Sequence, residues 1–419
     1  MSTIQGSGGI AIPKRLHQIL QKDGFLLLKE GGQEARNLYV NASLGLNPSL
    51  LNEFALVCLV GHIDEVTRLV ESGEAPNLSG TETPFKTGYA SLVCLGAQRV
   101  GSGPPGVRMD HAATLKFLLS HGCPPDVEDI VGHTALHHLT PRSFKPDLAR
   151  ILLENGANVN HQNRYGEVPI MHAMQAGIVE AIDLLMEFGA DIDIPEADGI
   201  TPRKFFVDYG PKVTATVTKW IRKRNGEEAP LGEKKCDNCG RSDVGLKQCS
   251  NCHSVRYCSS QCQRAQWKTH KPTCRPFDVT NTVSLRPIYD GHPFGMLIPT
   301  ADLKRKAMGI DVQTPPARNG HHSQVPSSFP KSLTIKVQVP YGGPGMSTHN
   351  SKADLLIYNK KRDFVCTVQY ATNPKAYTKI SQVVRSKGVG GAKAYFVAEL
   401  KSKDELIVKI DDVLAEQPF

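Results

Sequence analysis

The sequence predicts a multidomain protein in which an α-solenoid is followed by a small cysteine-rich domain and a C-terminal α+β unit. Three observations support this fold class: a repeat of about 33 residues within residues 49–226, seven cysteines within residues 236–274, and alternating apolar residues after residue 331. The 419 residues suffice for about two or three domains of ordinary size. We find no apolar run long enough to span a bilayer, so we expect no membrane association.

The N-terminal segment, residues 1–48, is expected to be partly flexible. It is rich in glycine, and residues 13–21 have the spacing of one short amphipathic helix with Leu16, Ile19 and Leu20 on one face. It lacks the charged region followed by an apolar run that marks a secretory signal. We therefore expect an intracellular protein, in the cytoplasm or the nucleus, whose cysteines stay reduced.

Residues 49–226 contain an internal repeat that is punctuated by glycines. The glycines that follow a Leu-Leu pattern stand 34 and 33 residues apart, at Gly122, Gly156 and Gly189. A glycine after a second helix can adopt the left-handed conformation that ends it. An earlier copy ends at Gly73, and its longer distance to the next copy predicts a loop insertion near residues 99–109.

A period of 33 residues, with a turn followed by two helices, resembles the ankyrin repeat. The resemblance is specific for residues 130–198, and it implies about four stacked units and a degenerate cap over residues 201–224. It also implies that His137 and His172 hydrogen-bond the neighbouring turn. Ankyrin repeats commonly meet partners at their hairpin tips, where Tyr165 is the most binding-like residue.

Eight potential metal ligands lie within residues 236–274: Cys236, Cys239, Cys249, Cys252, Cys258, Cys262, His270 and Cys274. Gaps of two or three residues let one turn direct two side chains at one ion, and thiolates with imidazole are typical zinc ligands. An iron–sulfur cluster is the alternative, but the paired spacing and the histidine favour zinc. A disulfide framework would leave one of seven thiols unpaired. We expect two structural zinc ions, and the residues alone leave a sequential pairing of the ligands open.

This spacing, together with Tyr257 and the Trp-Lys-Thr-His segment that ends at His270, closely resembles the MYND-type zinc finger. The resemblance implies an interleaved pairing, with Cys236, Cys239, Cys258 and Cys262 on one zinc and Cys249, Cys252, His270 and Cys274 on the other. Because every position is a ligand, no water would coordinate either ion. We therefore expect no Lewis-acid chemistry and no catalytic residues.

Gln263 and Trp267 are the partner-binding residues that we expect in the finger. They lie four residues apart on a predicted helix, and therefore on one face. An aromatic surface beside an amide suits a proline-rich peptide, and MYND fingers of corepressor-type proteins bind such peptides through the matching pair. The alternative is that Trp267 fills the interior of a finger too small to have another core.

The C-terminal part divides into a linker, residues 277–331, and a small α+β domain, residues 332–419. The linker includes a stretch rich in proline, glycine, serine and histidine, whereas Leu333, Ile335 and Val337 alternate as a strand requires. Segments 355–358 and 364–370 are predicted to form a hairpin, 375–387 a helix and 395–400 a strand. Ser402 with Glu405 has capping-box spacing, which predicts a last helix. No resemblance identifies this fold.

These modules predict a non-enzymatic, zinc-binding adaptor that binds protein partners, the finger taking a proline-rich peptide. The alternative is a nucleic-acid-associated transcriptional regulator, which the net charge of +8 favours, although we recognise no DNA-reading helix. A MYND-type lysine methyltransferase is a further alternative. It would need a cofactor-binding Gly-x-Gly segment beside a strand and an Asn-His-Ser-Cys-type motif, and we find neither.

Overall fold

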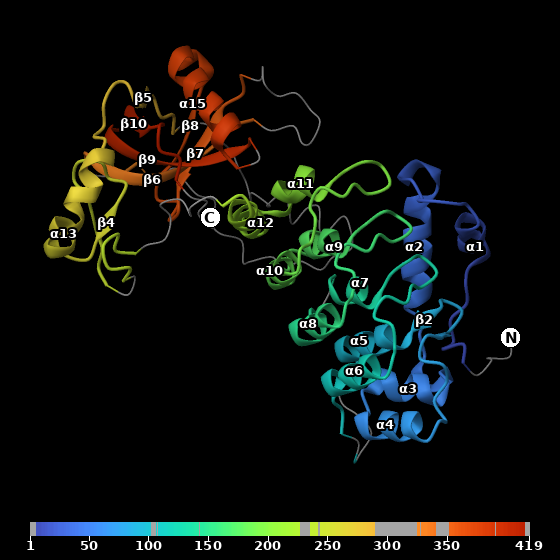
Figure 1. Ribbon diagram of the computed structural model, residues 1–419. Helices are drawn as coiled ribbons and strands as arrows, with labels where there is room; N and C mark the ends of the chain where they lie inside the picture. Colours follow the sequence, from blue (N-terminus) through green and yellow to red (C-terminus); the bar gives the residue numbers. More distant parts are fainter. Residues whose placement is uncertain are drawn as a thin grey trace. The chain divides into compact units, whose positions relative to one another are not determined.

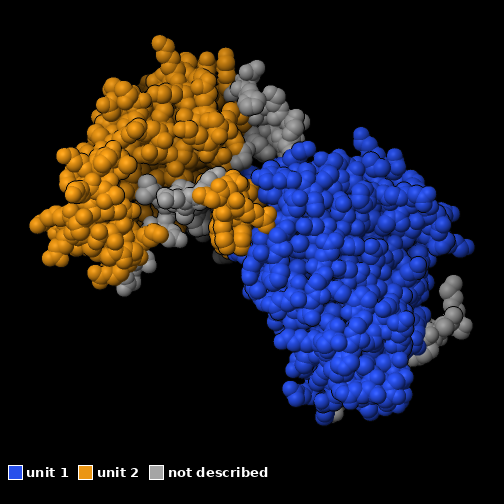
Figure 2. Space-filling model, viewed as in Figure 1, with its two compact units in different colours: residues 1–209 blue, residues 210–419 orange. Residues whose placement is uncertain are grey.

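The computed structural model describes residues 6–101, 106, 108–141, 143–226, 235–241, 244–289, 325–326, 328–340, 352–389 and 391–414. The chain divides into two compact units, Met1–Tyr209 and Gly210–Phe419 (Figure 2). No helix in these described stretches is both long and apolar enough to cross a membrane.

Four helix pairs form most of the first unit (Figure 1). They are α3 (Glu53–Val60) with α4 (Ile63–Glu71), α5 (Tyr89–Arg99) with α6 (His111–Ser120), α7 (Ala135–Leu139) with α8 (Pro146–Glu154), and α9 (Pro169–Ala176) with α10 (Val179–Glu187). The first helices contact one another in the order α3, α5, α7, α9, and the second helices in the order α4, α6, α8, α10. Each pair contributes buried aliphatic side chains, so neighbouring pairs share their apolar interior.

The second helices of the pairs end at the glycines that the sequence predicts. The glycines after the second helices, Gly73, Gly122, Gly156 and Gly189, have φ between 77° and 90°, in the left-handed region. Strands β1 (Thr81–Glu82) and β2 (Thr87–Gly88) pair in the hairpin between α4 and α5. The unit ends with α11 (Pro202–Phe205) and η3 (Phe206–Tyr209). Residues 102–105 and 107 of the predicted insertion lie outside the described part.

The N-terminal segment is packed onto the turns between the helix pairs. It contains α1 (Lys14–Leu20), η1 (Leu28–Glu30), α2 (Gly32–Ser43) and η2 (Pro48–Leu50). The helix predicted over residues 13–21 is therefore confirmed as α1. Its side chains Leu16 and Ile19 are buried in one cluster with Val131 and Tyr165 of the repeats. Residues predicted to be partly flexible thus form an apolar layer with the turns.

Arg36 of α2 makes one of the polar contacts in this layer. Its Nη2 lies 3.1 Å from Oε1 of Glu167, and its guanidinium lies 4.2 Å above the ring of Tyr165. Tyr165 is consequently 1% exposed. The expectation that this ring meets a protein partner is wrong, because the chain's own N-terminal segment covers it.

Replacing Arg36 by methionine is expected to loosen the N-terminal layer. The substitution removes the guanidinium partner of the buried Glu167 carboxylate and should cost about 2 kcal/mol, because the pair is largely shielded from water. We expect amide hydrogen exchange in residues 14–43 to accelerate by about 30-fold, measured on the full chain by mass spectrometry. Arg15→Met is the control, since Arg15 pairs with Glu34 in solvent; equal exchange in both variants would contradict the expectation.

The same contact predicts a dependence on pH. Burial by itself would raise the pKa of Glu167, but the hydrogen bond and charge of His172 and the charge of Arg36 lower it to about 2. Because the pKa in the folded chain is lower than the ordinary value of 4.5, the stabilisation is complete above pH 4.5 and is lost as the pH falls towards 2. The difference in exchange between wild type and Arg36→Met should therefore shrink below pH 4.5.

The second unit contains α12 (Pro211–Arg224), the cysteine-rich segment and a six-stranded antiparallel sheet. The sheet order is β5-β10-β9-β6-β7-β8. The strands are β5 (Thr282–Leu285), β6 (Lys331–Gln338), β7 (Leu355–Asn359), β8 (Val365–Val368), β9 (Lys393–Ser402) and β10 (Glu405–Lys409). Helix α15 (Pro374–Lys387) packs on one face, where Ile335, Phe396 and Val408 are buried with its Ile380. The predicted hairpin and helix are thereby confirmed.

Two expectations for this part are wrong. Residues 405–409 form strand β10 and not a helix, because Leu406 and Val408 point to the core while Glu405 and Ile407 alternate with them. The Ser402 hydroxyl accepts from the amide of Asp404 within the hairpin turn, so the capping-box spacing is coincidental. Residues 282–285, assigned to the linker, form edge strand β5 on β10.

Candidate metal centre

A small hairpin and one helix position the eight predicted ligands. Strands β3 (Lys247–Gln248) and β4 (Arg256–Tyr257) pair antiparallel, so Cys249 and Cys252 lie at the turn end of the hairpin, whereas Cys258, which follows β4, lies at the opposite end. Helix α13 (Ser260–His270) follows, with Ser259 as its N-cap accepting from the amide of Cys262, and η4 (Lys271–Thr273) leads to Cys274. The ligands therefore come from two tight turns and from both ends of one helix.

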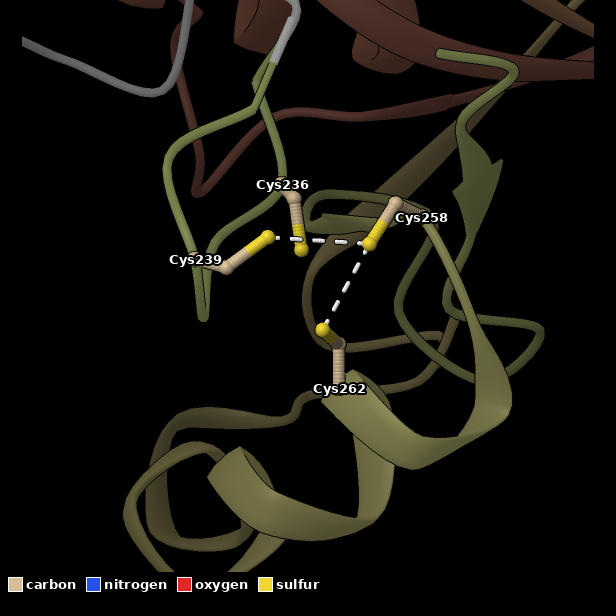
Figure 3. A group of neighbouring side chains, drawn as sticks. All are labelled: Cys236, Cys239, Cys258 and Cys262. Carbon is tan, nitrogen blue, oxygen red and sulfur yellow. Dashed lines mark hydrogen bonds between the residues drawn. The ribbon is translucent and has the colours of Figure 1, made fainter.

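The first group consists of Cys236, Cys239, Cys258 and Cys262, whose sulfurs point toward one another (Figure 3). The Sγ of Cys258 lies 3.6 Å from that of Cys239 and 3.4 Å from that of Cys262. A tetrahedral zinc site with Zn–S bonds of about 2.3 Å places its sulfurs about 3.8 Å apart. A disulfide would need about 2 Å, and these cysteines are free thiols.

The second group consists of Cys249, Cys252, His270 and Cys274. Here Sγ of Cys249 lies 3.9 Å from Sγ of Cys274, and Sγ of Cys252 lies 3.5 Å from Nε2 of His270. These separations also suit a tetrahedral ion. The structure thus assembles the ligands in the interleaved grouping and not in the sequential one that the residues alone left open.

The pKa values of these thiols indicate that each group suits a bound dication. Burial opposes ionisation of Cys236, but backbone amides, including that of Cys239, donate to its sulfur and lower its pKa to about 6. In contrast, hydrogen bonding with Cys262 raises the pKa of Cys258 to about 12, and burial raises that of Cys274 to about 11. Thiols this close cannot all ionise unaided, whereas a bound dication stabilises every thiolate.

Tyr257 fills the interior of this small domain, a role that the sequence analysis left unassigned. Its side chain is 2% exposed and lies in a cluster with Val255 and three of the ligand cysteines. The ring lies 6.3 Å from the ring of His270. Its position at the end of β4, directly before Cys258, was the available signal, because alternation turns that side chain inward.

Gln263 and Trp267 lie on α13 at the surface of the domain. Trp267 is 39% exposed, although its ring stands 5.8 Å from that of His270, and Gln263 is half-buried. Since Tyr257 fills the interior, the domain does not need Trp267 as its core. The helix that carries Cys262 and His270 therefore also presents the exposed indole of Trp267.

A buried lysine joins this domain to the sheet of the same unit. Lys409 at the end of β10 is 1% exposed, and its Nζ donates to the carbonyl of Arg275, next to the last ligand, at 3.0 Å. The same ammonium lies 2.7 Å from Oδ2 of Asp412, which also accepts from the Ser254 hydroxyl at 3.4 Å. Residues that follow Cys252 and Cys274 of the second ligand group are thus hydrogen-bonded to β10 and to Asp412 after it.

Comparison with known protein families identifies two of the domains. The model described as MYND finger matches residues 236–274, and the model described as ankyrin repeats (3 copies) matches residues 107–196. The chain therefore contains ankyrin repeats and a MYND finger, which confirms both resemblances. The two cysteine and histidine groups fit the zinc binding that this finger implies.

Several curated proteins are similar to parts of this chain. The E3 ubiquitin-protein ligase KEG of Arabidopsis thaliana is 25% identical over 217 residues, which are 49% of this chain and 12% of that protein. BCL-6 corepressor-like protein 1 of Homo sapiens is 40% identical over 76 residues, 18% of this chain and 4% of that protein. A putative ankyrin repeat protein of Rickettsia bellii (strain RML369-C) is 37% identical over 54 residues, 13% and 32% respectively. The match spans less than a third of each of these relatives.

Proposed function

We propose that this chain is a non-enzymatic adaptor in which the ankyrin repeats form one solenoid and the finger holds two structural zinc ions. Each module binds a protein partner in this proposal. The observation that carries it is that each group supplies four protein ligands, which leaves no position on either ion for a substrate, while the indole of Trp267 stays exposed on α13. Ankyrin repeats and MYND fingers generally mediate protein–protein interactions, which supports the same function.

The zinc ions in this proposal stabilise the finger. Cys236, Cys239, Cys258 and Cys262 hold one ion, and Cys249, Cys252, His270 and Cys274 hold the other. Metal binding supplies the folding energy of a domain whose apolar interior is little more than Tyr257 and Val255. Helix α13 carries ligands at both ends and so becomes a rigid platform for its outer face.

The outer face of α13 is the proposed peptide site of the finger. The indole of Trp267 offers a flat apolar surface for proline rings, and the amide of Gln263, one helical turn earlier, can donate to a peptide carbonyl. A proline-rich peptide is already extended, so it loses little conformational entropy when it binds. Such a peptide is therefore the partner class whose chemistry this face matches.

Replacing Trp267 by alanine is expected to weaken peptide binding by about 30-fold or more, since an exposed aromatic anchor of this kind contributes about 2 kcal/mol. The measurement is fluorescence anisotropy of a labelled decapeptide of prolines and leucines with the full chain. Trp220→Ala on α12 makes the same change outside the finger and should leave binding as in wild type. Unchanged binding by Trp267→Ala, with zinc content intact, would contradict the peptide site and leave the zinc assignment standing.

A further inference from the structure

A third group of ligand-type side chains lies in the ankyrin unit, outside the finger. Asp129, His133 and His138 each place one ligand atom so that all three atoms lie within 4.8 Å of one another. Asp129 belongs to the turn before α7, and His138 belongs to α7 itself. Unlike a solvated acidic cluster, this group is shielded, because the side chains of Asp129, His133 and His138 are 2%, 15% and 13% exposed.

The two side-chain oxygens of Asp129 make different contacts. Oδ1 accepts from the amides of Val131 and His133, both at 2.9 Å, which fixes the turn. Oδ2 is directed at the imidazoles instead, and the hydroxyl of Tyr39 donates to it. Carboxylates that bind metal ions are usually held in place by such a hydrogen bond from a neighbouring element.

The distances fit a common ion better than a set of hydrogen bonds. Oδ2 of Asp129 lies 3.7 Å from Nδ1 of His133 and 3.4 Å from Nε2 of His138. Ligand atoms of a tetrahedral zinc ion, with bonds of about 2.0–2.1 Å, stand about 3.4 Å apart. Although it lies this close and is buried, Nε2 of His138 has no hydrogen-bond partner among the described residues.

The equivalent turn of the next repeat does not build this arrangement. Asn163 stands 34 residues after Asp129 and makes the same backbone contacts, but its side chain is a neutral amide. His172, the equivalent of His138, lies 3.2 Å from Oε2 of Glu167 in its own turn. The expectation that His172 bonds the neighbouring turn is therefore wrong. His137 does so: its Nε2 donates to the Glu167 carbonyl at 3.1 Å.

We propose that Asp129, His133 and His138 bind one divalent transition-metal ion of the zinc class, separate from the two groups of the finger. One carboxylate and two imidazoles are a common ligand set for such ions. The partial exposure of both histidines provides a path for the ion. Three protein ligands leave one position open for water or for another ligand, which distinguishes this site from the closed sites of the finger.

The first test counts metal ions on the full chain. Protein is equilibrated with micromolar free Zn²⁺, passed through a desalting column and analysed by mass spectrometry for zinc and protein. We expect His138→Gln and His133→Gln each to hold one ion fewer than wild type. His161→Gln is the matched control: it removes an imidazole whose ring lies 5.8 Å from that of His137 but outside the ligand set, and it should hold as many ions as wild type.

The comparison is a difference of one ion, so it does not depend on how many ions the finger holds. Equal zinc content in wild type and both ligand variants would overturn the proposal. Circular dichroism of each variant verifies that the repeats stay folded. A second measurement loads wild type and His138→Gln fully with Co²⁺ instead of Zn²⁺: their difference spectrum should show visible d–d absorption without thiolate charge transfer. The absence of that absorption, or its appearance with a thiolate band, would equally overturn the site.

Discussion

Replacing Cys252 by serine is expected to cost the chain one zinc ion and to unfold the finger around the second ligand group. The remaining ligands, Cys249, His270 and Cys274, cannot close a tetrahedral site, and a structural zinc of this kind supplies on the order of 10 kcal/mol of folding energy. The domain has few apolar contacts to compensate for that loss, since its buried interior is formed mainly by the ligand cysteines with Tyr257 and Val255.

Zinc analysis and hydrogen exchange together measure this effect. We expect one ion fewer than in wild type, with exchange in residues 244–255 and 266–274 close to that of an unfolded segment, whereas residues 258–262 stay held by the first ligand group. Protection in β10 should fall as well, because Lys409 and Asp412 lose their contacts to Arg275 and Ser254. Cys123→Ser replaces a thiol of the ankyrin unit and should leave the zinc content unchanged. A Cys252→Ser variant with the full zinc content would refute the ligand assignment.

Replacing Gly96 by alanine is expected to be the most destabilising single methyl addition in the ankyrin unit. Gly96 lies in α5, and a Cβ at this position would stand 1.7 Å from the carbonyl oxygen of Leu59 in α3. The same oxygen accepts from Nε2 of His111 at 3.1 Å, so relief of the clash would also break that hydrogen bond. Because backbone must move apart from backbone, we expect a loss of at least about 3 kcal/mol.

Thermal unfolding of the full chain measures this loss. For a unit of about 200 residues, 3 kcal/mol corresponds to a decrease in the melting temperature of about 10 °C. Gly101→Ala is the matched control, because a Cβ there would meet no atom within 4 Å. It should melt at or slightly above the wild-type temperature. Similar melting of the two variants would show that α3 and α5 are not packed this closely.

The sequence predicted the helix repeats and the two groups of metal-ligand side chains. The helix pairs follow from a 33-residue period, and the eight ligands follow from their spacing, because both patterns are local. The grouping of the ligands was not local: the family resemblance implied it, and the fold of the β3–β4 hairpin and α13 produces it.

The remaining errors involve contacts between distant segments. Tyr165 looked like a surface residue because nothing near it in the sequence shows that Arg36 and α2 cover it. Residues 405–409 were predicted to be helical because Ser402 and Glu405 have capping-box spacing, yet pairing with β9 and β5 determines their conformation. Asp129, His133 and His138 were missed as a group because their spacing matches no ligand pattern and the turn brings them together.

The N-terminal layer has a practical consequence for any search for partners. The repeats look separable at residue 49, where the recognisable pattern begins, but α1 and α2 cover Val131 and Tyr165. A fragment that starts there would expose an apolar patch that the N-terminal segment buries in the intact chain. Proteins captured by such a fragment would bind this uncovered patch and not the intact chain, so a fragment used as bait must retain the first fifty residues.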